Sequence, residues 1–133
     1  MFVGFRIREV DDEELEEIAD LIMEIFPDAN LDFSDLDRVF VVENNQELVG
    51  FAHITDDDKR VIIRGFGVSE NYRNFGAGSA LMEKILELCE LSDRPVYLKV
   101  KALNPAIHLY ERYGFCLKKF GGAAHVIVKR MPS

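Results

Sequence analysis

The pattern of apolar and polar residues in the first half of the chain predicts one helix followed by a series of strands. Apolar residues recur at the helical period between Asp11 and Pro27, and Asp11 with Glu14 three positions later matches a capping box. Asn44-Asn45 is a suitable turn for a hairpin. Alternation of apolar and polar residues predicts strands over 5–9, 38–43, 47–55 and 61–68.

The second half predicts two more helices and three more strands. Asn104 is a good N-cap, Pro105 suits the first helical position, and Gly114 is placed to end the helix that they begin. The predicted elements are a helix over 80–91, a strand over 95–101, this short helix, and a hairpin of strands over 115–120 and 125–129. We therefore expect a single α/β (α+β) domain over residues 1–133.

Length and composition agree with one domain, because 133 residues with 48% hydrophobic content can bury a core without disulfides. Cys89 and Cys116 lie in apolar contexts and are interpreted as buried free thiols, and we expect no metal site. The chain opens without a signal-peptide pattern, and no apolar run approaches the ~20 residues that span a bilayer. We therefore expect a cytoplasmic protein without membrane association.

The formal net charge of −8 argues against nucleic-acid binding, which normally requires a basic surface. Acidic residues are concentrated in 11–17 and 56–58. We interpret these segments as a solvated helix start and a polar turn. The alternative is an acidic surface that attracts cationic amines.

The stretch Arg73-Asn74-Phe75-Gly76-Ala77-Gly78-Ser79 lies between a predicted strand and a predicted helix. Its glycines allow the backbone to approach a ligand, and the first amides of the helix can point at an anion. One interpretation is a turn that binds a pyrophosphate, with Arg73 adding a positive charge. The alternative is that Gly76 and Gly78 only allow the helix to pack tightly on the sheet. The stretch matches neither a Walker A loop nor the three-glycine dinucleotide fingerprint.

A second segment, residues 104–115, ends in Leu109-Tyr110-Glu111-Arg112-Tyr113-Gly114-Phe115. The order of an Arg-x-x-Gly-x-Gly turn, a long helix, a strand and this segment resembles the GNAT superfamily of acyl-CoA-dependent N-acetyltransferases over residues 47–130. The resemblance implies a GNAT-like fold. This fold has a central mixed, mostly antiparallel sheet of about six or seven strands, splayed at a parallel pair and flanked by about four helices.

The resemblance also implies that acetyl-CoA is the acyl donor. Gly65 and Gly67 by themselves indicate a bulge or a close backbone approach in the strand before the turn. By the resemblance, pantetheine would pair with the backbone of this strand and a backbone N–H of it would polarise the thioester carbonyl. The implied cofactor-binding residues are Phe66, Gly67, Val68, Arg73, Asn74, Phe75, Gly76, Ala77, Gly78, Ser79 and Asn104.

For catalysis, the resemblance implies that Tyr110 is the general acid toward the sulfur, although a core aromatic would also fit its helix face. Many relatives carry a glutamate where this chain has Ile62 or Lys99, and neither residue can serve as that base in the usual way. His53 is our first choice as the substitute base. Glu43, a carboxylate within 28–35 and a chain of waters are the alternatives.

Three hypotheses of function follow. The first is an N-acetyltransferase that moves an acetyl group from acetyl-CoA to a primary amine of a small molecule, a peptide N-terminus or a lysine. The second is a catalytically degenerate acyl-CoA-binding sensor or interaction module. The third is an unrelated α/β domain that binds another phosphorylated ligand. Short segments around the expected acceptor site favour an open site, which suits a peptide end or a lysine. The sequence does not distinguish a monomer from a homodimer, because strand edges near either terminus could pair or not.

Overall fold

The centre of the protein is a seven-stranded mixed sheet with the strand order β1-β2-β3-β4-β5-β7-β6. The computed structural model describes residues 5–27, 36–73, 75–91, 94–101, 107–121 and 125–130. The strands are β1 (Arg6–Glu9), β2 (Asp37–Asn44), β3 (Glu47–Asp56), β4 (Val61–Val68), β5 (Val96–Lys101), β6 (Cys116–Gly121) and β7 (His125–Arg130). Only β4 and β5 run parallel, and the other neighbouring pairs are antiparallel. The mixed, mostly antiparallel sheet of the sequence prediction is confirmed.

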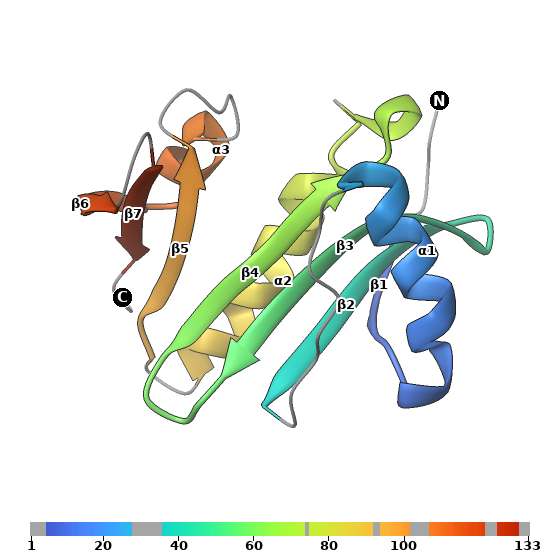
Figure 1. The fold of residues 1–133 in the computed structure, drawn as a ribbon, viewed down its shortest axis with the longest axis horizontal. Coiled ribbons are helices and arrows are strands. Elements are labelled where there is room, and N and C mark those ends of the chain that lie inside the picture. The colour runs from blue at the N-terminus through green and yellow to red at the C-terminus, as the bar shows by residue number, and fades with distance from the viewer. Residues whose placement is uncertain are drawn as a thin grey trace.

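Helices cover both faces of this sheet (Figure 1). The α-helices are α1 (Leu15–Ile25), α2 (Ala77–Leu91) and α3 (Ile107–Arg112), and the 3₁₀ helices are η1 (Asp12–Glu14) and η2 (Glu70–Tyr72). In Figure 1, α1 lies in front of the sheet and α2 behind it. We call these two faces the α1 face and the α2 face.

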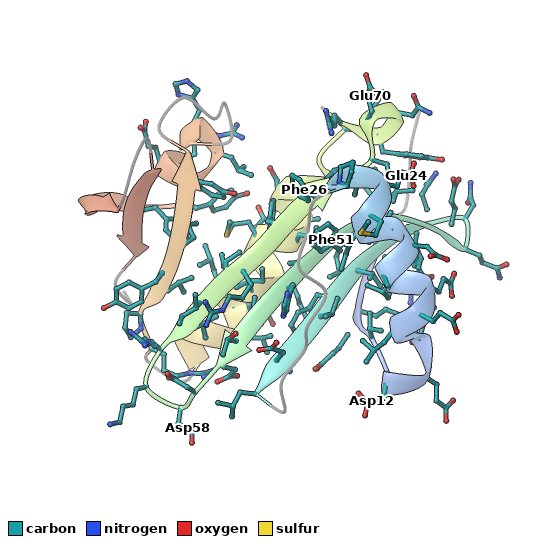
Figure 2. All side chains as sticks on the ribbon, in the orientation of Figure 1. Asp12, Glu24, Phe26, Phe51, Asp58 and Glu70 are labelled. Atoms are coloured by element: carbon teal, nitrogen blue, oxygen red, sulfur yellow. The ribbon has the colours of Figure 1, made fainter. Side chains whose placement is uncertain are left out.

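Alternation along the strands divides the core between the two faces. In β2, Val39 and Val41 belong to the cluster that packs with α1, whereas Phe40 and Val42 belong to the cluster that packs with α2. The central strands are therefore apolar on both sides, which is expected when helices cover both faces of a sheet. Figure 2 shows Phe51 on the α1 face, where it belongs to the same cluster as Val39 and Val41.

The first helix begins and ends where the sequence predicts. Asp11 and Glu14 form the capping box, and Arg8 of β1 donates two hydrogen bonds to the Glu14 carboxylate at 2.7 and 2.6 Å. Helix α1 ends at Ile25, and Phe26 leaves the helical conformation with φ −131° and ψ 87°. This conformation is expected of a residue that precedes proline, here Pro27.

Two local expectations were wrong. The hairpin between β2 and β3 turns at Asn45 and Gln46, whose φ values are 53° and 71°, and not at Asn44-Asn45. Two positive φ values match the type I′ geometry of a two-residue hairpin. Cys116 is exposed rather than buried because it begins β6, which lies at the edge of the sheet. The side chain of Cys89 lies outside the described part of the structure.

Candidate active site

The parallel strands β4 and β5 separate after a short paired segment. They pair from Val61 with Val96 to Ile63 with Leu98. Beyond this point, β4 is paired with β3 alone, and a register shift leaves Arg64 without an opposite residue in β3. Arg64 therefore forms a β-bulge where the strands part. We call residues 64–68 of β4, on the side toward β5, the open edge, and Figure 1 shows β5 diverging from it.

Backbone direction decides which groups face the open edge. The Ser69 N–H donates to the Val49 carbonyl in β3 at 2.8 Å, and Ser69 continues the register in which Val68 pairs with Gly50. Because the hydrogen-bonding groups of a strand alternate between its two sides, Phe66 and Val68 direct theirs toward β5. Gly67 directs its own toward β3. The backbone groups of Phe66 and the N–H of Val68 thus face the gap, whereas the Val68 carbonyl accepts a hydrogen bond from Arg73 and the N–H of Gly67 points toward β3.

The glycines of β4 admit aromatic rings onto its backbone. A Cβ atom at Gly67 would lie 2.9 Å from Cε2 of Phe26, and one at Gly65 would lie 3.1 Å from Cε2 of Phe51. These two rings meet edge to face, with centroids 6.1 Å apart, on the α1 face (Figure 2). The close approach that the glycines predicted is therefore made by the protein itself. No side chain projects from Gly65 or Gly67 over the α1 side of the open edge.

The helix α2 begins at the glycine turn, three residues earlier than predicted. Its first hydrogen bond runs from the Ala80 N–H to the Gly76 carbonyl at 3.0 Å. The amides of Ala77, Gly78 and Ser79 therefore have no partner within the helix, and the helix dipole adds positive potential there. Gly76 has φ +91°, a conformation that favours glycine, and a Cβ atom on it would meet nothing within 4 Å. Asn74 lies outside the described residues.

The surroundings of Gly78 bear on the interpretation that this glycine only allows α2 to pack tightly on the sheet. A Cβ atom on Gly78 would lie 3.7 Å from Cε1 of Phe66 and 3.9 Å from Cγ2 of Val68, which is ordinary contact. Close packing of α2 on the sheet therefore does not require glycine at this position. The contacts also place the side chains of Phe66 and Val68 on the α2 face, below the first turn of α2.

Arg73 links the open edge to the start of α2. The 3₁₀ helix η2 turns the chain back after β4, and Arg73 Nε donates to the Val68 carbonyl at 3.0 Å. The hydroxyl of Tyr72 donates to the Glu47 carboxylate at 2.8 Å and fastens this turn to the β2–β3 hairpin. The exposed guanidinium of Arg73 thus lies beside the gap-facing carbonyl of Val68. Phe75, in the same turn, is 49% exposed.

Tyr110 lies against the open edge from the α2 face. Its ring meets the Phe66 ring at a centroid distance of 6.3 Å and the Phe115 ring at 5.8 Å, both edge to face. Only 6% of Tyr110 is exposed, and burial raises the pKa of its phenol to about 12. The phenol therefore keeps its proton throughout the neutral range. Asn104, predicted to begin this helix, lies outside the described residues.

A polar network lies across β2, β3 and β4 on the α1 face. His53 Nε2 lies 2.9 Å from Asp37 Oδ2, and the Thr55 hydroxyl donates to Asp37 Oδ1 at 2.8 Å. Arg64 Nε in turn donates to the Thr55 hydroxyl at 3.0 Å. The side chains of His53 and Asp37 are only 11% and 9% exposed. Because a carboxylate only accepts, His53 Nε2 carries a proton in this contact.

Sequence reasoning found His53 but missed Asp37, Thr55 and Arg64. The signal for Asp37 and Thr55 was the alternation of β2 and β3, which places Asp37 on the face of Val39 and Thr55 on the face of His53. Joining the two required the register of the hairpin, in which Asp37 pairs with Thr55. That register depends on a turn that was predicted one residue too early.

The family's usual base positions lie near this network. Ile62 pairs with Thr55 and lies between Val61 and Ile63, which belong to the α2-face core, so Ile62 points to the α1 face. His53 pairs with Gly65, and it lies on the same face as Thr55, the partner of Ile62 two residues further along β3. Lys99 pairs with Ile127 of β7, and its side chain lies outside the described part of the structure. His108 is exposed on α3.

Comparison with known proteins decides the family. The model of the acetyltransferase (GNAT) family matches residues 5–115. The chain belongs to this GNAT family. It is therefore an acyltransferase whose acyl donor is acetyl-CoA, and the third hypothesis, an unrelated phosphate-binding domain, was wrong. A comparison with curated protein sequences found no significant match.

Solved structures share the GNAT fold at low sequence identity. The ribosomal-protein-S18-alanine N-acetyltransferase of Escherichia coli has a TM-score of 0.85 at 18% identity, covering 98% of this chain and 95% of that chain. Naa50 of Arabidopsis thaliana, in complex with the bisubstrate analogue CoA-Ac-MVNAL, has a TM-score of 0.82 at 23% identity, covering 96% and 99%. PaiA N-acetyltransferase of Thermoplasma acidophilum, in complex with coenzyme A, has a TM-score of 0.82 at 13% identity, covering 97% and 99%. The GNAT-like fold with its splayed parallel pair is confirmed.

Two features are absent from the residues that the structure describes. None of their helices has both the length and the apolar character needed to cross a bilayer. They also contain no group of three His, Cys, Asp or Glu side chains placed to hold a metal ion.

Proposed function

We propose that this GNAT enzyme transfers the acetyl group of acetyl-CoA to the α-amine at the end of a peptide. The observation that carries the proposal is the continuous run of donors from Phe66 and Val68 to the first amides of α2. Such a run suits a ligand with amide groups at one end and a diphosphate at the other. Acetyl-CoA has this form, with its thioester beyond the pantetheine amides.

In the proposed complex, pantetheine lies along the open edge as an added strand, bonded to Phe66 and Val68. The pyrophosphate lies at Ala77, Gly78 and Ser79, where the helix start favours an anion. Arg73, Phe75 and Gly76 of the turn are proposed to assist in holding the cofactor. Asn74 and Asn104 remain proposed cofactor-binding residues. The Phe66 N–H, next to the bulge, donates to the thioester oxygen as negative charge develops there.

The acceptor amine approaches from the α1 face. Phe66 and Tyr110 fill the α2 side of the open edge. On the α1 side, the rings of Phe51 and Phe26 pack on Gly65 and Gly67, and this side also carries the polar side chains of His53 and Arg64. The amine nitrogen attacks the carbonyl carbon from this side and the carbon–sulfur bond breaks. The products are an N-acetylated amine and coenzyme A.

His53 is the proposed acceptor of the amine proton. It lies opposite Gly65, and the Asp37 carboxylate holds its Nε2 at 2.9 Å, which orients the imidazole as a general base requires. The demand on this base is modest for a peptide end, because an α-amine has an ordinary pKa of about 8 against about 10.4 for lysine. An α-amine acceptor is thus compatible with Ile62 in the position where relatives carry glutamate.

Tyr110 is the proposed donor toward the leaving sulfur. With a pKa of about 12, it is protonated at neutral pH. Complete transfer to a thiolate, whose conjugate acid has a pKa of about 8.5, would be uphill. Tyr110 therefore stabilises the developing thiolate chiefly by a hydrogen bond, and the sulfur is finally protonated as coenzyme A leaves.

The acceptor class has support from the solved relatives. The Escherichia coli enzyme is named for the alanine of ribosomal protein S18, and Naa50 was solved with an analogue that joins coenzyme A to a peptide. The test is incubation with acetyl-CoA and pentapeptides, with and without a blocked amino end, followed by mass spectrometry. We expect one acetyl group on each free amino end and none on blocked lysine-containing peptides. Binding of acetyl-CoA without transfer to any amine would instead assign the degenerate acyl-CoA-binding alternative.

A further inference from the structure

Two arginines beside the open edge differ from the other arginines that make side-chain bonds in the described part of the structure. Arg64 and Arg73 are each held through Nε by an uncharged oxygen, that of Thr55 and that of Val68. The others bind carboxylates: Arg8, Arg38, Arg60 and Arg94. In a chain of net charge −8, a guanidinium held by a hydroxyl rather than a carboxylate keeps its positive field for another anion.

The position of Arg64 directs this field toward the acceptor. Arg64 is the bulged residue of β4, and two residues of extended strand, about 7 Å, separate it from Phe66. Its bond to Thr55 places it on the α1 face, on which His53 also lies. Arg73 lies at the other end of the open edge, where the donor's pyrophosphate is proposed to bind.

The side chain of Arg64 is exposed but held in place. Nε is fixed by Thr55, and Thr55 is fixed by the buried carboxylate of Asp37. Among the described residues, no carboxylate is bonded to the two terminal nitrogens of Arg64. Two parallel N–H groups in a fixed fork are the arrangement that binds a carboxylate with two hydrogen bonds.

We propose that Arg64 selects acceptor peptides whose first residue carries a carboxylate, aspartate or glutamate. The inference rests on the proposed peptide α-amine acceptor. When the amine lies beside His53, a carboxylate a few ångströms away reaches the terminal nitrogens of Arg64. Phe26, packed on Gly67, bounds the other end of this surface with an apolar ring. The carboxylate therefore sets the direction in which the peptide lies.

The test is a competition between two peptides that differ only in the first residue, which is aspartate in one and asparagine in the other. Both peptides are incubated together with the enzyme and acetyl-CoA, and mass spectrometry measures the amount of each acetylated product. A second pair compares glutamate with glutamine. The product ratio gives the ratio of the two kcat/KM values directly. We expect the acidic peptide to be preferred by about tenfold in the parent enzyme, and less at high salt.

Variants separate recognition from a structural role. Arg64→Gln is expected to bring the ratio close to one, and Arg64→Lys, which keeps the charge but not the fork, to give an intermediate ratio. Arg60→Gln is the matched control, because Arg60 lies in the β3–β4 turn, paired with Asp57, and is expected to keep the parent ratio. If the role of Arg64 were purely structural, its replacement would lower kcat/KM for both peptides equally and leave the product ratio unchanged.

The outcomes distinguish this proposal from the one on which it rests. Transfer to both peptides at equal rates, or an unchanged preference in Arg64→Gln, overturns the acceptor class and leaves the peptide acetyltransferase standing. Transfer to neither peptide by a parent enzyme that binds acetyl-CoA overturns the peptide α-amine function, and the acceptor class with it.

Discussion

The two halves of the active site are built from different parts of the chain. On the donor side, the main-chain groups of Phe66 and Val68 and the first amides of α2 come from one continuous segment, residues 66–79. On the acceptor side, Asp37, His53 and Arg64 contribute side chains from three strands. A site made of backbone groups depends on local conformation, whereas a site made of side chains depends on strand register. The difference determines which half a sequence reveals.

The largest expected effect tests the donor side at Phe66. Replacing Phe66 by phenyllactate changes its amide to an ester, which removes the N–H and keeps the ring. We expect kcat to fall by about 10²- to 10³-fold, because the thioester oxygen loses its donor in the transition state. Turnover at saturating acetyl-CoA measures the effect.

The matched control is the ester at Gly67, made with glycolate. Its lost N–H belongs to the β3 ladder, so this variant is expected to lose stability rather than rate. Equal losses of kcat in the two esters would contradict the assignment of Phe66 to the open edge.

The next effect tests the acceptor side at His53. We expect His53→Ala to lower kcat/KM by about 10²-fold at neutral pH, because the amine loses its proton acceptor. The deficit should shrink above pH ~8, where an α-amine is already neutral in solution. Rates from pH 6 to 10 measure both expectations.

Asp37→Asn and Thr55→Val divide the contributions of the network. Asp37→Asn removes the carboxylate that holds His53 and is expected to lower kcat/KM less than His53→Ala does. Thr55→Val leaves the contact between Asp37 and His53 in place and is expected to lower kcat/KM least of the three. A deficit in His53→Ala that is constant with pH would remove His53 from proton transfer.

The same division explains what the sequence could predict. The Arg-x-x-Gly-x-Gly turn predicted the anion site because its conformation is local: Gly76 has φ +91° and α2 starts directly after it. The splayed strand pair came from the family resemblance, since no local pattern shows where β4 and β5 separate. The role of Asp37 was not predicted, because its partners, His53 and Thr55, lie across a hairpin whose register depends on the turn at Asn45 and Gln46.

Tyr110 is expected to have a smaller effect on rate. We expect Tyr110→Phe to lower kcat by about tenfold, the value of one hydrogen bond to a developing anion, with little change in KM for acetyl-CoA. Steady-state kinetics at a fixed peptide concentration, with acetyl-CoA varied, measure kcat and KM separately. An unchanged kcat would make Tyr110 a core aromatic, the alternative that its helix face suggested.

The same residue gives a prediction on stability at alkaline pH. The folded-state pKa of about 12 exceeds the ordinary value of about 10, so the folded protein holds a proton that the unfolded chain has released in this window. The free energy of unfolding should fall as pH rises from about 10 to 12, by at most about 3 kcal/mol. Urea unfolding followed by circular dichroism should show this component in the parent and its absence in Tyr110→Phe.

The smallest effects compare the two glycines of the turn. Gly76→Ala is expected to lose about 1–2 kcal/mol of stability, because alanine resists a φ of +91°. Gly78→Ala is expected to gain up to about 1 kcal/mol, since its Cβ would make only ordinary contacts in a helix. Thermal unfolding measures both, and a destabilised Gly78→Ala would restore the packing interpretation of that glycine.

The most direct test of the donor site is a titration of the ¹⁵N-labelled protein with coenzyme A, followed amide by amide by NMR. The account predicts that the resonances of Phe66, Val68, Ala77, Gly78 and Ser79 shift together, with one dissociation constant, while those of Gly65 and Gly67 shift least. An unchanged spectrum at millimolar coenzyme A, or shifts that leave out the amides at the start of α2, would contradict it.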